Sequence, residues 1–153
     1  MHPDPQTLCR ETEEFLHAQI PITHAMGVRV EAYDATIGRL VLTAPLEVNH
    51  NHLGTAFGGS LSALCTLAGY ALLWLELGDR HSHIVVRDSA IQYKHPVRGK
   101  LIRVECVRPE AAVMTHFRER FAKQGKARIK LESVVEEEGQ RCVEFAGTFV
   151  AMR

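Results

Sequence analysis

The sequence AFGGSLSALCTLAGYALLWL, from Ala56 to Leu75, is a run of twenty residues without a charged side chain. As an α-helix it would be about 30 Å long and apolar on every side, as in helices buried in the core of soluble proteins. A membrane span has the same length and lack of charge, but this run contains serine, threonine and three glycines, so its hydropathy is modest. We therefore expect a central helix buried inside a domain, and no membrane partner.

Segments with strand-like patterns surround this helix in the sequence and would supply its apolar partner. They are Val28–Tyr33, Leu40–Ala44, Ile84–His95, Leu101–Val107, and a hairpin of Lys126–Val135 with Arg141–Met152. A helix that is apolar all round needs a sheet curved around several of its sides. We expect an α+β fold in which one antiparallel sheet of about five to six strands wraps a single long helix. The exposed outer face of that sheet favours a homodimer, with a tetramer as an alternative.

Two other segments complete the predicted architecture. Pro5–Ile20 carries apolar residues at helical spacing and predicts an N-terminal helix that Pro21 ends. Glu110–Lys123 fits either a short helix or an irregular crossover. The length indicates a single domain over residues 1–153.

Composition narrows the function. Eighteen basic residues balance eighteen acidic ones, so there is no charge argument for binding nucleic acid. The four cysteines lack CxxC spacing and the N-terminus lacks the features of a signal peptide, so we expect a cytoplasmic protein with free thiols. The pairs His50/His52 and His81/His83 have no acid or cysteine at ligand spacing, and we expect no metal.

A polar loop precedes the apolar run, and the two together resemble a known family. The pattern N-x-x-G-T-x-F-G-G-S-L at Asn51–Leu61, with VRDSAIQYKHPVRGK at Val86–Lys100, is similar to the hotdog fold of the thioesterase superfamily. The closest likeness is to the subgroup named for the YiiD C-terminal domain. The resemblance implies an enzyme acting on short acyl thioesters of acyl carrier protein or coenzyme A, with no cofactor beyond the phosphopantetheine that the substrate carries.

The resemblance also implies catalytic residues. Some members of the subgroup decarboxylate malonyl-acyl carrier protein for fatty acid biosynthesis, and their key asparagine falls on Asn51 here. Asn49 is the alternative if the loop register is shifted by two residues. A similar Asp-Ser pair in the family falls on Asp88 and Ser89, and Asp88 would be the acid for a hydrolase.

The helix itself favours an electrophilic site. Relatives that resemble phenylacetyl-CoA thioesterases have a histidine where Phe57 stands and an acid where Thr66 stands, which puts hydrolysis in doubt. Gly58 and Gly59 let a substrate approach the backbone, and the free N–H groups of a first helical turn can bind a developing oxyanion. Other candidate substrate-binding residues near this turn are Asn49, His52, Thr55, Phe57, Ser60, Thr66 and Ser89.

A basic segment near the C-terminus is a candidate carrier-binding surface. Its residues are Arg118, Arg120, Lys123, Lys126 and Arg128. Acyl carrier protein is acidic and coenzyme A bears phosphates, so either could bind there. The alternative is an ordinary charged face balanced by Glu136–Glu138. Three functions remain open: a malonyl-thioester decarboxylase, an acyl thioesterase, and a non-catalytic acyl-binding or dimerisation module.

Overall fold

The computed structural model describes residues 3–153. Its strands are β1 (Arg29–Asp34), β2 (Arg39–Pro45), β3 (His83–Tyr93), β4 (Leu101–Val107), β5 (Lys126–Glu137) and β6 (Gln140–Met152). Its helices are α1 (Pro5–Gln19), α2 (Ile22–Ala25), the 3₁₀ turn η1 (Leu46–Val48), α3 (Gly58–Leu77) and α4 (Ala111–Gln124).

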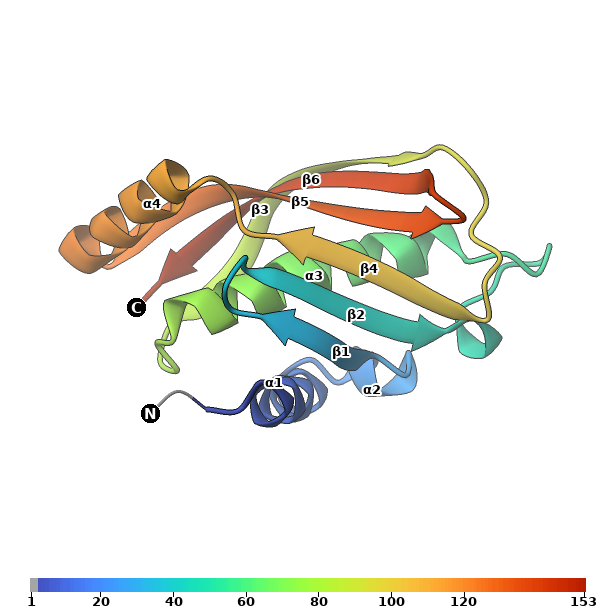
Figure 1. Cartoon of the computed structure of the whole chain (residues 1–153), viewed down its shortest axis with the longest axis horizontal. Helices are drawn as coiled ribbons and strands as arrows, with labels where there is room; N and C mark the ends of the chain where they lie inside the picture. Colours follow the sequence, from blue (N-terminus) through green and yellow to red (C-terminus); the bar gives the residue numbers. More distant parts are fainter. Residues whose placement is uncertain (1–2) are drawn as a thin grey trace.

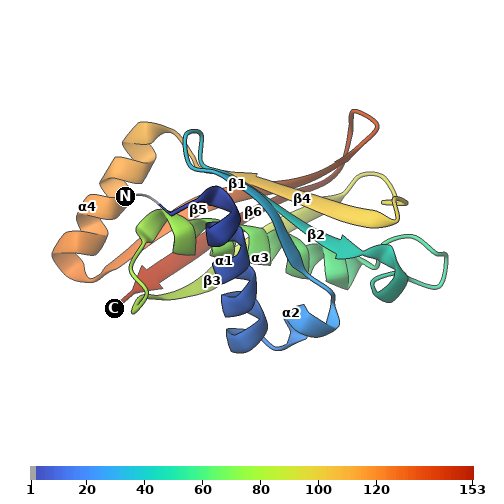
Figure 2. The same cartoon turned by 60° about the horizontal axis from the view of Figure 1, so that its bottom comes forward.

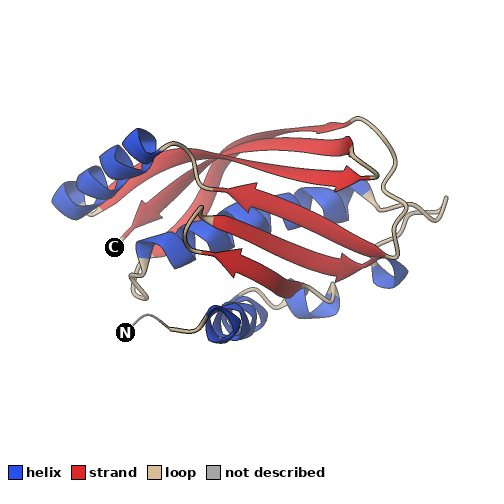
Figure 3. Cartoon of the chain, viewed as in Figure 1, coloured by secondary structure: helices blue, strands red, loops and turns tan. Residues whose placement is uncertain are grey.

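The six strands form one antiparallel sheet in the order β1-β2-β4-β5-β6-β3. The sheet curves around α3, which runs along its concave face (Figures 1 and 3). This arrangement confirms the predicted α+β hotdog architecture, including the N-terminal helix and the long β5–β6 hairpin. The short elements α2 and η1 were not predicted, because three or four residues are too few to show a helical period.

The central helix is enclosed because its apolar side chains pack mainly against the apolar concave face of the sheet. Ten of its residues are buried, and they face β2, β3, β4, β5 and β6. Gly69 lies so close to the sheet that a Cβ there would come within 2.5 Å of the Phe149 ring. By length and composition α3 also qualifies as a candidate membrane span. Its enclosure by the sheet is what a core helix of the same composition shows.

The N-terminal helix α1 covers the remaining side of α3. Asp4 caps α1 by accepting a hydrogen bond from the Thr7 amide at 3.2 Å. Phe15 stacks on Trp74 of α3 with 4.4 Å between ring centroids. Figure 2 shows α1 crossing in front of α3 and beside β1. The sheet therefore closes one side of α3, and α1 closes part of the other.

The segment that the sequence left open between helix and crossover is a regular helix of 14 residues. Met114, Phe117 and Phe121 are buried along one side of α4, at spacings of three and four. The helix ends at Gly125, whose φ of +67° is the left-handed conformation that glycine adopts most readily. The spacing of these apolar residues did indicate a helix, but the basic side chains between them weakened the pattern.

Strand β3 forms one edge of the sheet and pairs only with β6. A bulge between Val86 and Asp88 interrupts this pairing at Arg87. Val85, Val86 and Tyr93 are 40–51% exposed along the strand. Eleven residues of unpaired edge with exposed apolar side chains are a template for a further strand.

Replacing Gly69 by alanine tests the close approach of α3 to the sheet. The added methyl group would overlap the Phe149 ring, so Gly69→Ala should lower the free energy of unfolding by about 1–3 kcal/mol. Urea denaturation followed by circular dichroism measures the change. Ser62→Ala on the same helix is the control, because Ser62 is not fully buried and its hydroxyl makes no hydrogen bond within residues 3–153. A Gly69→Ala protein as stable as the control would contradict the packing argument.

Candidate functional site

The loop before α3 is a short hairpin anchored at its base. His50 and Ala56 form an isolated antiparallel bridge, and the Phe57 amide donates to the Asn49 carbonyl at 2.8 Å. The Ala56 amide donates to the Val97 carbonyl at 2.9 Å, which ties the loop to the segment before β4. The tip extends beyond the end of the sheet, at the opposite end of the molecule from α4 (Figure 1). The base of the loop therefore fixes where α3 begins.

Asn49 is the buried member of the two candidate asparagines. Its side chain is 2% exposed, and its Nδ2 donates to the carbonyls of Met26 and Pro45, both at 2.8 Å. Its Oδ1 is buried and has no hydrogen-bond partner within residues 3–153. Asn49 thus joins the loop to the end of β2 and to the turn after α2. Its buried Oδ1, which has no partner among the described residues, offsets part of the stability that these hydrogen bonds provide.

Asn51 holds the tip of the loop. Its Oδ1 accepts from the Leu53 amide at 2.9 Å and from the Thr55 amide at 3.2 Å. Its Nδ2 donates to the Thr55 hydroxyl at 2.9 Å. These contacts make an Asx-type turn, the local role that asparagine commonly has. The second Nδ2 hydrogen has no acceptor within residues 3–153, and it is the group that a substrate could use.

The start of α3 has no side-chain cap. Phe57 is the N-cap residue, and its side chain accepts no hydrogen bond. The first intrahelical bond runs from the Leu61 amide to the Phe57 carbonyl at 3.0 Å. The amides of Gly58, Gly59 and Ser60 therefore have no acceptor among the described residues. Gly59 is exposed, and Gly58 and Ser60 are half-buried, so these three N–H groups, with the positive end of the helix dipole, are open to an anionic ligand.

Two aromatic rings border this turn. The Tyr93 hydroxyl, from the end of β3, donates to the Gly58 carbonyl at 3.1 Å. The Phe57 ring is 55% exposed and lies over Gly59, where it occupies the space of any Cβ. A side chain at position 59 would therefore collide with the Phe57 ring. A Cβ on Gly58 would make only ordinary contacts with Tyr93 at 3.6 Å. Tyr93 was not among the predicted site residues, because its place beside the helix start depends on the tertiary structure.

Nucleophiles and acids are scarce on this side of the helix. Burial raises the pKa of the Cys65 thiol to about 12, which keeps the thiol protonated and unreactive. The Thr66 hydroxyl donates to the Ser62 carbonyl of its own helix at 2.9 Å. The nearest carboxylate on α3 is Glu76, eighteen residues from Gly58 and therefore about 27 Å along the helix axis.

The structure places the Asp88–Ser89 pair on opposite faces of β3. Asp88 is in register with Thr148, which points away from α3, and its side chain is 69% exposed. Its only charged neighbour within residues 3–153 is Arg87, at 3.8 Å. Ser89 is in register with Gly147 on the α3 side and is exposed. Asp88 does not line the helix start of its own chain, so it could serve only a site built with another copy. His52, at the loop tip, is also exposed.

The basic segment divides into two parts in space. Arg118 donates to Glu76 at 2.7 Å, and Arg108 reaches the same carboxylate at 3.2 Å. Glu76 is only 5% exposed, so Arg118 helps to neutralise a buried charge rather than extending a basic surface. Lys123 is exposed on α4. Arg120, Lys126 and Arg128 line a groove together with His116 of the same helix and Arg87, which comes from β3.

The acids expected to balance this segment lie at the other end of the hairpin. Glu137 accepts hydrogen bonds from the amides of Arg98 and Gly99, both at 2.8 Å, and Glu136 pairs with Arg141 at 3.4 Å. Strand β5 separates Glu137 from Lys126 by about 35 Å. Glu136 and Glu137 thus pair with groups at their own end of the hairpin, and the alternative in which they balance the basic segment by direct contact is wrong.

Comparison with known proteins places the chain in a family. Residues 9–153 match the family described as "Putative thioesterase (yiiD_Cterm)". The chain belongs to this family.

Solved structures of similar proteins agree with that assignment. A protein of unknown function from Chlorobaculum tepidum TLS is 32% identical, with a TM-score of 0.86 over 97% of this chain and 96% of that one. The putative thioesterase from Shewanella oneidensis is 28% identical, with a TM-score of 0.81 over 97% and 99%. A probable thioesterase from Pseudomonas aeruginosa is 26% identical, with a TM-score of 0.79 over 98% and 97%. The hotdog fold and membership of a thioesterase family are thus established together.

Replacing each of the two asparagines by alanine should lower the free energy of unfolding by different amounts. Asn49→Ala removes two buried hydrogen bonds and leaves the carbonyls of Met26 and Pro45 without partners, which should cost about 2–4 kcal/mol. Asn51→Ala, in a partly exposed turn, should cost about 1 kcal/mol or less. Urea unfolding of both variants measures the difference. Equal losses would contradict the structural role that we assign to Asn49.

Proposed function

We propose that this chain decarboxylates the malonyl thioester of acyl carrier protein, giving the acetyl thioester. The observation that carries the proposal is the start of α3, where the amides of Gly58, Gly59 and Ser60 lack acceptors among residues 3–153, and where the helix itself carries no histidine and no acid before Glu76. Such a helix start can stabilise negative charge, but its own side chains offer no base to activate water. Decarboxylation needs the first ability and not the second.

The proposed reaction uses the N–H groups at the point where charge develops. The bond between the α-carbon and the carboxylate breaks, carbon dioxide leaves, and the electron pair forms an enolate whose charge collects on the thioester oxygen. The Gly58, Gly59 and Ser60 amides donate to that oxygen. Removal of one such donor typically costs about 3–4 kcal/mol of transition-state stabilisation. The α-carbon then takes a proton from water, and the thioester remains intact.

Asn51 has a supporting role in this proposal. Its free Nδ2 hydrogen donates to the substrate carboxylate and holds the breaking bond out of the thioester plane. A neutral donor suits this step better than a lysine, because a full positive charge would stabilise the carboxylate before it is lost. The turn contacts with Thr55 hold the amide in one orientation.

Thioester hydrolysis is the second candidate, and the family description favours it. Hydrolysis requires a base for water or a carboxylate nucleophile. Asp88 is the acid that the family resemblance supplies, and it lies on the outer face of the edge strand. A hydrolase would therefore need a second copy of the chain to bring Asp88 to a helix start. The third candidate function is a non-catalytic acyl-binding module. In such a module the uncapped amides would bind an acyl group but would stabilise no transition state.

We also infer that the chain forms a homodimer through the exposed edge of β3. Strand addition there would pair the free backbone groups and cover Val86 and Tyr93. Sedimentation should show a dimer for the native chain, and Val86→Arg should shift it toward monomer. A native chain that sediments as a monomer at micromolar concentration would contradict this inference.

The products distinguish the candidate reactions. Incubation with malonyl-acyl carrier protein should yield acetyl-acyl carrier protein, seen as the loss of carbon dioxide from the intact protein mass without release of free thiol. Thiol release from a panel of acyl thioesters would instead identify a hydrolase. No turnover of any thioester would leave the binding module.

Two replacements of Asn51 separate its catalytic role from its turn role. Asn51→Ala should abolish decarboxylation. Asn51→Asp keeps both acceptor contacts of Oδ1 and lets the Thr55 hydroxyl donate in return, so the loop should stay folded. It replaces the free N–H by negative charge, so kcat should fall about 100-fold or more with little change in thermal stability. Full activity in Asn51→Asp would show that Asn51 acts only in the turn.

A further inference from the structure

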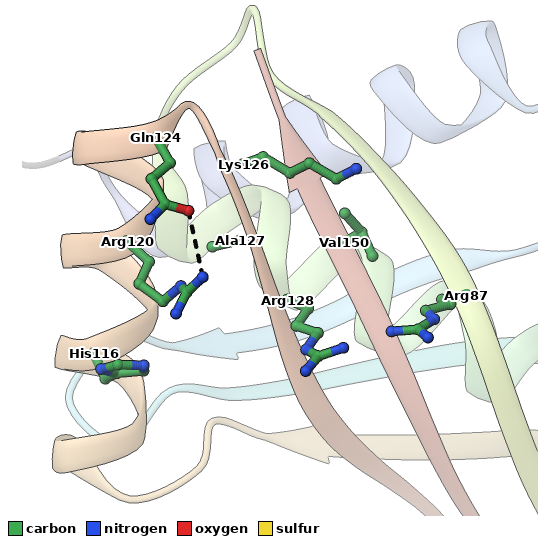
Figure 4. Close-up of a pocket in the computed structure, with 8 residues that line it drawn as sticks. All are labelled: Arg87, His116, Arg120, Gln124, Lys126, Ala127, Arg128 and Val150. Atoms are coloured by element: carbon green, nitrogen blue, oxygen red, sulfur yellow. Dashed lines mark hydrogen bonds between the residues drawn. The ribbon is translucent and has the colours of Figure 1, made fainter.

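A groove on the outer face of the sheet is lined by eight residues, of which four are arginine or lysine. It lies between α4 and the neighbouring strands and has a cavity volume of about 620 Å³. Figure 4 shows the residues that line it, which are Arg87 of β3, His116, Arg120 and Gln124 of α4, Lys126, Ala127 and Arg128 of β5, and Val150 of β6. The long cationic side chains come from three separate elements and surround one hollow.

The positive charges in this groove are not balanced by the protein. Within residues 3–153, Arg120, Lys126 and Arg128 form no ion pair, and Arg120 contacts only the Gln124 side-chain oxygen at 3.3 Å. Arg87 has Asp88 at 3.8 Å, with both side chains more than half exposed. Among residues 3–153, none with an acidic side chain lines the cavity. Like charges gathered in this way repel one another, so a bound anion would relieve an existing cost.

The other half of the same sheet shows how this chain otherwise places arginine. Arg39 of β2 pairs with Glu105 of β4, and Arg103 of β4 pairs with Glu31 of β1. In both cases the guanidinium makes two hydrogen bonds to the carboxylate, which holds it against the sheet. The chain has a net charge of zero, and in this half of the sheet each of these arginines is paired with a glutamate on a neighbouring strand. The arginines of the groove are not paired in this way.

A second cavity continues the groove and has a different character. It has a volume of about 480 Å³ and shares His116 and Arg128 with the first. Half of its lining is apolar, formed by Ala112, Val113, Phe117 and Ile129, and Lys130 and Thr148 complete the wall. A ligand that filled both cavities would place anionic groups among the arginines and an apolar or aromatic body along α4. Concave sites of this size, with a few convergent polar groups, are typical of small-molecule binding.

The groove is remote from the start of α3. The Arg153 amide donates to the Gly125 carbonyl at 2.9 Å, and the Arg153 side chain pairs with Asp79 at 3.3 Å. These contacts place the beginning of β5 beside the C-terminal end of α3. The helix is 20 residues long, so about 30 Å and the sheet itself separate the groove from the Gly58–Ser60 turn of the same chain.

We propose that the groove between α4 and the outer face of the sheet binds a phosphorylated small molecule of nucleotide size. Guanidinium groups match the geometry of phosphate oxygens, and three of them converge here. The adjoining apolar cavity receives the nucleoside-like part. An acidic carrier protein is a less suitable occupant, because the charges line the inside of a hollow rather than a protruding surface.

Calorimetry with adenosine 3′,5′-bisphosphate tests this site without any thioester or turnover, so its outcome is independent of the proposed reaction. The native chain should bind it saturably, and more weakly as sodium chloride is added. Arg120→Gln and Arg128→Gln should each weaken binding about tenfold or more through loss of charged hydrogen bonds. Lys123→Gln is the matched control, because it removes one charge from α4 outside the groove and should change binding less than twofold. Unchanged thermal unfolding confirms that the variants are folded.

Three results would overturn the proposal. The first is no saturable binding of the bisphosphate by the native chain. The second is equal weakening by Arg128→Gln and Lys123→Gln, or equal binding of adenosine, since either would show that the arginines do not recognise phosphate. The third is that the arginine variants weaken binding of an acidic carrier protein while the bisphosphate does not bind, which would make the groove a protein-docking surface. Inorganic phosphate, tested alone, should bind more weakly than the bisphosphate because it leaves the apolar cavity empty.

Discussion

The contact between α3 and the concave face of the sheet is the constraint on which the rest of the structure depends. A 20-residue helix without charge until its last turn has to be enclosed, and Gly69 lets it approach the Phe149 ring closely enough for the sheet to do so. Because both faces are apolar, their burial supplies the main driving force for the fold. Once α3 is held along the sheet, its N-terminal turn has to emerge at one end, where the loop from Asn49 to Phe57 meets it.

The same enclosure gives the candidate site its chemistry. A helix that is buried along its length can carry neither acids nor bases on most of its surface without a large desolvation cost. What it can offer is its end, where amides lack partners by the geometry of the helix itself. Glu76, a carboxylate near the other end of the helix, pairs with Arg108 and Arg118 and lies about 27 Å from the N-terminal turn. Stabilisation of a developing oxyanion by backbone N–H groups is therefore the chemistry best suited to this fold.

The charged side chains on the outer face of the sheet are arranged differently in its two halves. Across β1, β2 and β4, arginines and glutamates alternate between neighbouring strands and cancel locally. Beside α4, the lining of the groove contains Arg87, Lys126 and Arg128 from the strands and Arg120 from α4, and among the described residues only Arg87 has an acidic neighbour, Asp88. Protein stability does not require this second arrangement, which is why a ligand is the physical explanation that we favour. The two candidate sites use different means, helix amides in one and guanidinium groups in the other, at opposite ends of the molecule.

Periodicity along the chain was enough to predict the strands and the long helix that their sheet surrounds. The alternation in Leu101–Val107, the hairpin pattern near the C-terminus and the uncharged run from Ala56 each reflect an element whose burial depends on its own sequence. The family resemblance added the loop and its asparagines. It did not distinguish Asn49 from Asn51, because their difference lies in partners at Met26, Pro45 and Thr55 rather than in their own positions.

The sequence by itself thus determined the six strands, the N-terminal helix and the central helix, and that the central helix offers no acid near its start. Only the tertiary structure decided which charges meet. Arg118 pairs with Glu76 instead of lining the groove with the other basic residues, and Arg87 lines that groove from a distant strand. The Asp88 side chain points outward after a bulge. The reason is physical: local periodicity fixes the face on which a side chain lies, whereas the partner of a charged group is set by contacts between residues far apart in the chain.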